Sequence, residues 1–151
     1  MAVRLGQGSF EYVLVVGIAM ILIVPGAMLF YNYSTRSTDE LVRSKVDMVG
    51  NDILDSVERV YYIGENSWET IEVDVPDGVT WIYVLNNSEL VITYSSHVGE
   101  SEAVFFSDIN MTAPYNLDEK FYITDPAYAH AGLNVIKVTS KGKYVLINET
   151  R

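Results

Sequence analysis

The sequence predicts an α+β fold in which a long N-terminal helix, the stem, packs against a C-terminal antiparallel β-sheet or small β-sandwich, the head. Three observations predict it. Residues 13–30 contain no charged side chain. From residue 69 onward, short alternating runs are separated by turn residues, which is typical of strands. Between these regions lies an apolar stripe with the three- and four-residue spacing of a helix: Val42, Val46, Val49, Ile53, Val57 and Val60.

Composition narrows the functional classes. The chain has 151 residues, enough for one domain with an appendage. Its net charge of −10 argues against a partner held by phosphate contacts, so we expect no nucleic-acid partner. The absence of cysteine excludes disulfides, thiolate metal sites and cysteine nucleophiles.

The 13–30 run cannot remain in water. Thirteen of its 18 residues are Val, Leu, Ile, Met or Phe. At about 1.5–3 kcal/mol for each buried side chain, its gross driving force for burial is about 20–40 kcal/mol, whereas whole domains are stable by only about 5–15 kcal/mol. The run must lie in lipid or among other apolar helices. Its length suits a single membrane span, and no A-x-A site follows it as in an ordinary secretory signal peptide.

The residues before this run carry a distinct pattern. Arg4 is the only charged side chain ahead of Glu11, which favours a cytoplasmic N-terminus. A carboxylate at the mouth of a membrane helix is costly. One explanation is a helix start, with Ser9 as the cap and Glu11 in the first turn, facing the positive end of the helix dipole.

The stretch Gln7-Gly8-Ser9-Phe10-Glu11-Tyr12 also resembles the class III signal peptides of archaeal type IV pilin-like proteins, in which a short leader precedes Gln-x-Ser-x-Glu-Tyr/Phe and an apolar helix. The resemblance is close over the first 30 residues. It implies that a prepilin-type peptidase removes leader residues 1–6 by cleaving between Gly6 and Gln7. This leader has one basic residue where two or more are common. Archaellins begin with a different, glycine-rich motif and are a weaker match.

The resemblance further implies a function. The mature helix, 7–63, would rest in the cell membrane and then pack against identical helices in an extracellular, type IV pilus-like filament for surface adhesion. Partners would be further copies of the chain, the peptidase and the pilus assembly machinery. In that family the glutamate, here Glu11, is thought to neutralise a neighbouring subunit's terminal amine. The alternative is a single-pass, membrane-anchored ectodomain that binds a partner without polymerising.

Several residues should bend, end or stabilise the predicted long helix. Pro25 should bend it, and small residues such as Gly17 and Gly26 allow close helix contact. Residues 32–38 have low helix propensity and leave two options open: one continuous helix, which we favour, or two helices with a break there. Gly64 is a stop signal. Pairs four residues apart, Asp39–Arg43 and Asp55–Arg59, should support the helix.

The head, 69–151, is expected to contain several short strands. Two hairpins are predicted, 79–85 with 89–95 and 133–139 with 143–148, because each pair of runs flanks a short polar turn. Residues 107–120 are expected to form an irregular loop. The remaining predicted strands are 69–75, 103–106 and 121–124.

Four N-x-Ser/Thr triplets, more than chance predicts, leave two options open: an exposed surface with N-glycosylation sites, or polar loops that contain such triplets without being modified. Their asparagines are Asn32, Asn86, Asn110 and Asn148. No catalytic constellation is visible, so we expect no enzyme, metal site or cofactor. His97 and His130 lie far apart, and no EF-hand spacing joins the acidic residues near 69–77 and 118–125. A hydrolase tethered by its helix is therefore the weakest alternative.

Overall fold

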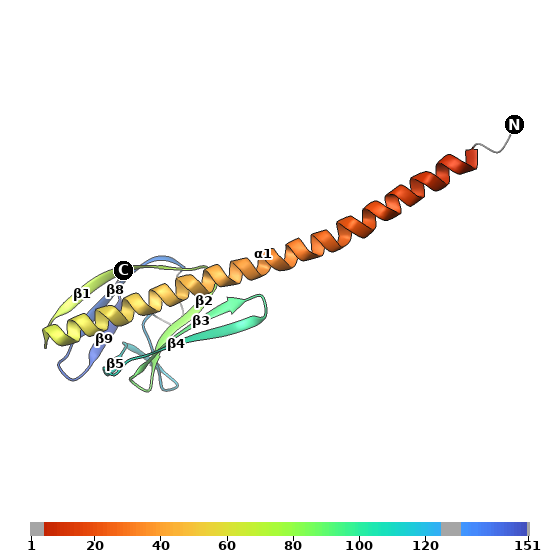
Figure 1. The fold of residues 1–151 in the computed structure, drawn as a ribbon. Coiled ribbons are helices and arrows are strands. Elements are labelled where there is room, and N and C mark those ends of the chain that lie inside the picture. The colour runs from red at the N-terminus through yellow and green to blue at the C-terminus, as the bar shows by residue number, and fades with distance from the viewer. Residues whose placement is uncertain (1–4, 125–130, 151) are drawn as a thin grey trace. The chain divides into compact units, whose positions relative to one another are not determined.

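The computed structural model describes residues 5–124 and 131–150, with side chains from Phe10 onward. The chain divides into two compact units, Met1–Thr38 and Asp39–Arg151. The first contains the N-terminal part of a single helix, α1 (Leu5–Ile63). The second contains the remainder of α1 and all the strands of the described chain (Figure 1). The predicted α+β class, with a helix packed on a β-rich head, is confirmed.

Helix α1 is continuous through residues 32–38, as we favoured. The polar side chains there bond back to their own helix instead of ending it. The Thr35 hydroxyl donates to the carbonyl of Tyr31 at 3.1 Å, and the Thr38 hydroxyl donates to the carbonyl of Ser34 at 3.0 Å. Gly64 follows the last helical residue with a φ of 118°, a conformation that favours glycine, so the predicted stop is confirmed.

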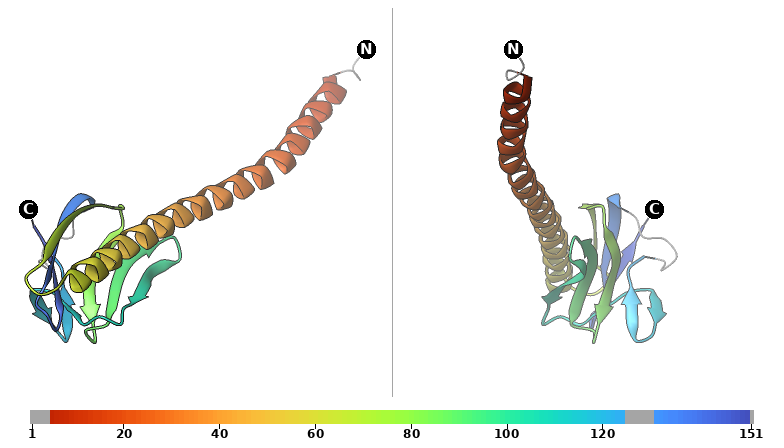
Figure 2. Two further views of the ribbon diagram at one scale, coloured as in Figure 1. Left: turned by 60° about the vertical axis from the view of Figure 1, so that its left-hand side comes forward. Right: turned by 90° about the vertical axis from the view of Figure 1, so that its right-hand side faces the viewer.

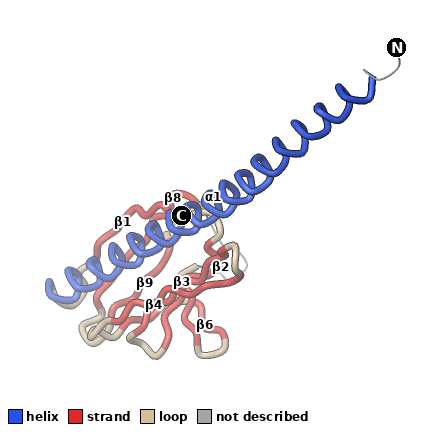
Figure 3. The backbone as a smooth tube through the Cα atoms, turned by 45° about the vertical axis from the view of Figure 1, so that its right-hand side comes forward, coloured by secondary structure: helices blue, strands red, loops and turns tan. Residues whose placement is uncertain are grey.

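The strands form two sheets. The four-stranded sheet has the order β1-β8-β9-β5, and the five-stranded sheet has the order β4-β3-β2-β7-β6. Both lie on one side of the Asp39–Ile63 part of α1 (Figures 2 and 3). The strands are β1 (Trp68–Val75), β2 (Val79–Leu85), β3 (Glu89–Ser96), β4 (Gly99–Phe106), β5 (Met111–Thr112), β6 (Tyr115–Leu117), β7 (Lys120–Tyr122), β8 (Gly132–Ser140) and β9 (Val145–Glu149).

Both predicted hairpins are present, as β2–β3 and β8–β9, each antiparallel. The β2–β3 turn places Asn86 and Asn87 at positive φ, which asparagine tolerates better than most residues. The β1 strand pairs antiparallel with β8 although about 60 residues separate them in the chain. One pair departs from the antiparallel prediction, because the short strand β5 lies parallel to β9.

One hydrophobic core joins the helix and both sheets. The predicted stripe supplies the helix side: Val46, Val49, Ile53, Val57 and Val60 are buried, and Val42 is partly buried against them. The sheets contribute alternate residues of their strands, as the pleat requires. These are Val73, Val75, Ile82, Val84, Leu90, Ile92, Tyr94, Met111, Ile136, Val138, Val145 and Ile147, and Ile123, directly after β7, joins them.

The prediction of an irregular loop over 107–120 was wrong. This segment contains β5, β6 and the first residue of β7. Strands of two or three residues are too short to show alternation. The β6–β7 turn uses Asp118 and Glu119 at positive φ, with no glycine or proline to mark it. Met111, in β5, is fully buried. Strand β4 also begins earlier than expected, at Gly99, because its polar first half pairs with β3.

Polar contacts fasten α1 to the head, and they differ from the helix pairs that the sequence predicted. Arg59 and the buried Ser56 donate to the Glu69 carboxylate at 3.1 and 2.7 Å. Near the other end of β1, Lys45 pairs with Asp74 at 3.1 Å. The hydrogen bond from Ser56, reinforced by Arg59, lowers the pKa of Glu69 below its ordinary value. Arg59 therefore bonds across to β1, a partner that spacing along the helix does not reveal.

Asp39 likewise bonds across to another element. Its carboxylate accepts hydrogen bonds from the backbone N–H of His97, at 3.2 Å, and from the His97 ring Nδ1. These bonds tie the β3–β4 turn to α1 and lower the pKa of Asp39, chiefly through the side-chain bond to His97.

Candidate functional site

The most prominent surface of the first unit is the apolar face of α1. Every large apolar side chain from Phe10 to Phe30 is exposed. Among the described residues, this is one helix long and apolar enough to cross a membrane, by length and composition alone. The 18 residues of 13–30 span about 27 Å at 1.5 Å per residue, close to the roughly 30 Å of a bilayer's hydrocarbon core. The helix is compatible with a membrane anchor or with a pilin stem.

The residues of the predicted processing motif lie at the start of this helix. The backbone is helical from Leu5, so Ser9 is not the helix cap and Glu11 is not in the first turn. The interpretation of both residues as a simple helix start was therefore wrong. Glu11 and Tyr12 are exposed. The side chains of Gln7 and Ser9 lie outside the described part of the structure, and cleavage between Gly6 and Gln7 stays a prediction.

Within the apolar segment, Pro25 lies inside the helix, which continues on both sides of it. A Cβ built at Gly17 or Gly26 would meet nothing within 4 Å. These glycines make no tertiary contact that requires their small size, so the space beside them is open to another helix. The predicted bend at Pro25 stays a prediction.

The four glycosylation triplets lie in different settings. Asn86 is exposed in the β2–β3 turn, where its amide nitrogen lies 3.4 Å from Glu89 Oε1. Asn110 is exposed between β4 and β5, and its carbonyl accepts a bond from the Val145 N–H. Asn148 is half-buried in β9, and Asn32 is exposed on α1. Glycosylation at these positions stays a prediction.

The acidic side chains and the histidines of the head are the groups that could support metal binding or catalysis. No three His, Asp or Glu side chains of the described residues gather where they could hold a metal ion. The acidic residues of β1 do not converge on one point: Glu69 accepts bonds from Ser56 and Arg59, Asp74 pairs with Lys45, and Glu72 is exposed. His97 contacts Asp39. His130 and Asp125 lie outside the described residues.

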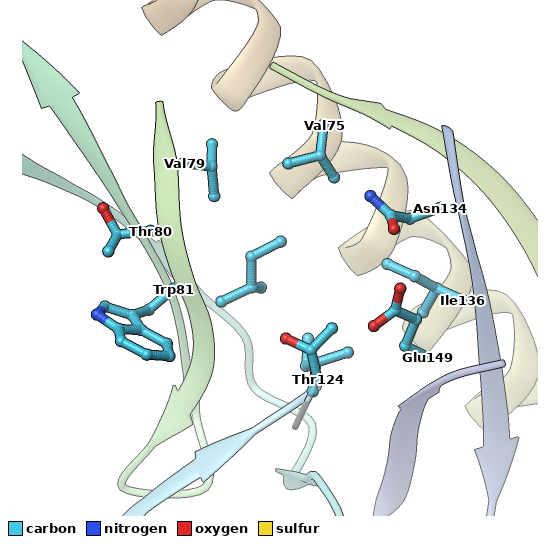
Figure 4. A pocket seen from close by; sticks show the side chains of 10 residues that line it. Val75, Val79, Thr80, Trp81, Thr124, Asn134, Ile136 and Glu149 are labelled. Atoms are coloured by element: carbon cyan, nitrogen blue, oxygen red, sulfur yellow. The ribbon is translucent and has the colours of Figure 1, made fainter. Parts of the chain in front are cut away.

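A crevice of about 20 Å³ lies between the two sheets (Figure 4). That volume is about the size of one water molecule. Val75, Val79, Ile82 and Ile136 give it an apolar wall, and Glu149 and Asn134 lie at its polar side (Figure 4). The crevice is too small for an organic substrate, whose pockets measure about 300–1,000 Å³.

Two larger hollows, of about 260 and 430 Å³, lie beside α1; Asp52, Arg59 and Glu72 line the first, and Arg43, Asp47 and Glu102 line the second. Both are lined mainly by polar atoms, unlike the mostly apolar pockets that bind organic molecules. The exposed apolar helix is therefore the stronger candidate for the functional surface.

No protein family model, curated protein or solved structure matches this chain.

Proposed function

We propose that this protein is a structural subunit that polymerises through its apolar N-terminal helix into an extracellular, type IV pilus-like filament used in surface adhesion. The observation that carries the proposal is the complete exposure of a helical segment with 18 consecutive uncharged residues. Moving its apolar side chains out of water is favourable by about 20–40 kcal/mol in gross transfer free energy. The segment must therefore be covered by other apolar groups. Identical helices supply that cover in a filament, and lipid supplies it beforehand.

The motif ahead of the run favours polymerisation over a plain anchor. A single-pass anchor gains nothing from Glu11, whose carboxylate at the mouth of the apolar segment is costly in lipid. An unpaired charge in an apolar bundle costs several kcal/mol. Cleavage before Gln7 releases a terminal amine, and a carboxylate beside that amine would neutralise it and remove the cost for both groups. We assign that pairing to Glu11.

A membrane-anchored ectodomain is the second candidate, because the span matches one bilayer thickness. The two functions differ in the fate of the helix. A filament subunit leaves the membrane with the helix intact, whereas an anchored ectodomain stays in lipid.

The test is to examine sheared surface material by electron microscopy and to determine the N-terminus of the protein it contains. The proposal predicts filaments of a chain that begins at Gln7. A matched pair of variants isolates the charge: Glu11→Gln should abolish or strongly reduce filaments, and Glu58→Gln, which removes an exposed carboxylate from the same helix, should not. Normal filaments from the Glu11→Gln chain would remove the assigned role, and a chain found only in the membrane fraction would favour the anchor.

A further inference from the structure

The two ends of the head differ in charge. We call one of them the Ile63 end; it comprises residues 61–68 and 137–144. Hydrogen bonds join its parts: Asn66 N–H donates to the Ser140 carbonyl at 3.0 Å, and Ser140 N–H donates to the Ser67 carbonyl at 2.9 Å. In Figure 1 the end of α1 and the β8–β9 turn lie together. These ranges carry three of the chain's five lysines and one acidic residue, Glu65, for a net charge of +2. Glu69, which lies opposite Val138 at the border of this end, is paired with Arg59, so the two together add no net charge.

The Ile63 end is also apolar. Tyr62 is 79% exposed, Ile63 75% and Trp68 63%. The Lys137 ammonium lies 4.9 Å from the centre of the Trp68 ring, an arrangement that holds a positive charge against an exposed aromatic face. Exposed tyrosine and tryptophan side chains are enriched in protein interfaces. The lysines beside them supply a charge that would select the sign of the partner surface.

We call the opposite end of the head the Asp39 end; it comprises residues 39–43, 76–78 and 96–100. Its parts are also joined, since His97 bonds to Asp39 and the Ser95 N–H donates to the Gly78 carbonyl at 2.8 Å. It carries four acidic residues against Arg43, for a net charge of −3 with His97 neutral. The acidic residues are Asp39, Glu40, Asp77 and Glu100. Val98, 83% exposed, and Leu41 provide an apolar component here too.

The two ends are separated by the length of the head. Asp39 and Ile63 are 24 residues apart on one helix, about 36 Å at 1.5 Å per residue. Strand β1 runs back alongside that helix, since Arg59 pairs with Glu69 and Lys45 with Asp74. The head is therefore an elongated unit with a basic, aromatic end and an acidic end.

We propose that the Ile63 end of one copy docks on the Asp39 end of a second copy, so that the heads join head to tail. Charge complementarity identifies the occupant: an acidic chain repels its own copies in general, but these unlike ends attract. A contact between unlike surfaces does not close as a twofold dimer and extends into rings or open filaments. The inference rests on the proposed function, which supplies the polymer. It adds a second contact outside the stem, one that combines charged and apolar side chains. The contact can be weak alone, because packed stems keep the heads at high effective concentration.

The test uses charge exchange in the full-length chain. Lys141→Glu with Lys143→Glu makes the Ile63 end acidic, and Asp77→Lys with Glu100→Lys makes the Asp39 end basic. Each double variant should lower filament yield several-fold at low salt. The quadruple variant, whose ends are again complementary, should recover most of it. A quadruple variant no better than either double variant overturns the proposal.

Cysteine cross-linking separates this inference from the stem-driven polymer, because the chain has no native cysteine. Chains with Lys143→Cys are mixed with chains with Glu100→Cys in detergent micelles or lipid vesicles at high density, and disulfide dimers are measured by non-reducing electrophoresis. The matched control replaces Glu100→Cys by Asn116→Cys, an exposed position in β6 outside both ends. We expect dimers from the first mixture, fewer in high salt, and none above background from the control.

The outcomes distinguish the two proposals. Cross-links without filaments support head-to-tail docking and contradict the proposed function. Filaments without the specific cross-link contradict head-to-tail docking and leave the proposed function standing. Equal cross-linking in both mixtures indicates random collision and also overturns the docking. The Ile63 end could instead bind an anionic surface polymer. In that case binding would depend on the lysines, but chains with Lys143→Cys would form no disulfide dimer with chains with Glu100→Cys. That result would also overturn head-to-tail docking.

Discussion

Gly50 offers the sharpest test of how the helix packs on the head. It is buried in the middle of α1. A Cβ placed on it would lie closer than 3.0 Å to the far end of the Phe105 ring, on β4. Contacts that close do not occur between real side chains, so in Gly50→Ala either the ring or the helix must shift. The glycine is therefore where an aromatic side chain of the five-stranded sheet approaches the helix backbone.

Two effects oppose each other in Gly50→Ala. Alanine is favoured over glycine in a helix interior by about 1 kcal/mol. Forcing extra volume into a packed core costs about 1–3 kcal/mol, and a displaced Phe105 gives up part of the roughly 1.5–3 kcal/mol of its burial. We expect packing to win, with a net loss of about 1–2 kcal/mol. For an m-value of about 2 kcal/mol/M in urea, the midpoint falls by about 0.5–1 M.

The assay is urea unfolding of the full chain in detergent, followed by tryptophan fluorescence. The chain has two tryptophans, Trp68 and Trp81, both in the second unit, so the signal reports the head. Gly26→Ala, where a Cβ meets nothing within 4 Å, is the control and should leave the midpoint unchanged. Phe105→Leu should relieve the clash, so that the double variant is less destabilised than the sum of the two single ones. A Gly50→Ala chain as stable as wild type, or more stable, would refute the reasoning.

Three further predictions concern the same interface. Ile53→Ala, at a fully buried helix position, should cost about 2–5 kcal/mol in the same urea assay, while exposed Asp52→Ala should stay within about 0.5 kcal/mol; a tolerated Ile53→Ala would contradict the assigned core. Because the pKa of Glu69 is lowered in the folded state, its contribution to stability is present above its ordinary value of 4.5 and is lost as pH falls through the lower folded pKa. In Glu69→Gln the free energy of unfolding should therefore fall less steeply as the pH is lowered into the acid range. An unchanged pH dependence there would contradict the stabilising contact of Glu69 with Ser56 and Arg59. His97→Ala should raise amide hydrogen exchange in residues 39–43 and in the β3–β4 turn more than elsewhere in the head, and uniform or unchanged exchange would mean that the bond to Asp39 fastens nothing.

The parts of the fold that the sequence predicts well are those with a long or strongly marked pattern. The valine and isoleucine stripe identified the buried helix face because its spacing repeats over five turns. Polar turns flanked by β-branched runs identified both hairpins. The pairing of β1 with β8 could not be predicted, since register between strands about 60 residues apart depends on the whole core and not on a local turn.

The polar contacts were predicted less well. Spacing along a helix suggested partners for Asp39 and Arg59, but the structure pairs them with His97 and Glu69 on strands brought close by folding. The charge difference between the ends of the head has a partial signal in the sequence, since Lys137, Lys141 and Lys143 fall within seven residues of an acidic chain. Their proximity to Tyr62 and Trp68 arises only when the β8–β9 turn meets the end of α1.

The central claim is that the intact apolar helix ends up covered by further copies of itself, and one labelling measurement tests it most directly. Val15→Cys places a single thiol on the exposed apolar segment of a cysteine-free chain. Two samples are compared: in one, surface material with a free thiol is treated with a membrane-permeant thiol reagent; in the other, the thiol is labelled with a fluorophore before assembly and the material is exposed to a lipid-soluble quencher. We expect the thiol to be present in sheared filaments and shielded from both probes there, but open to the quencher in the membrane fraction. Surface material whose chain lacks the labelled segment, or a thiol that remains open to the lipid-phase quencher in every fraction, would contradict the account.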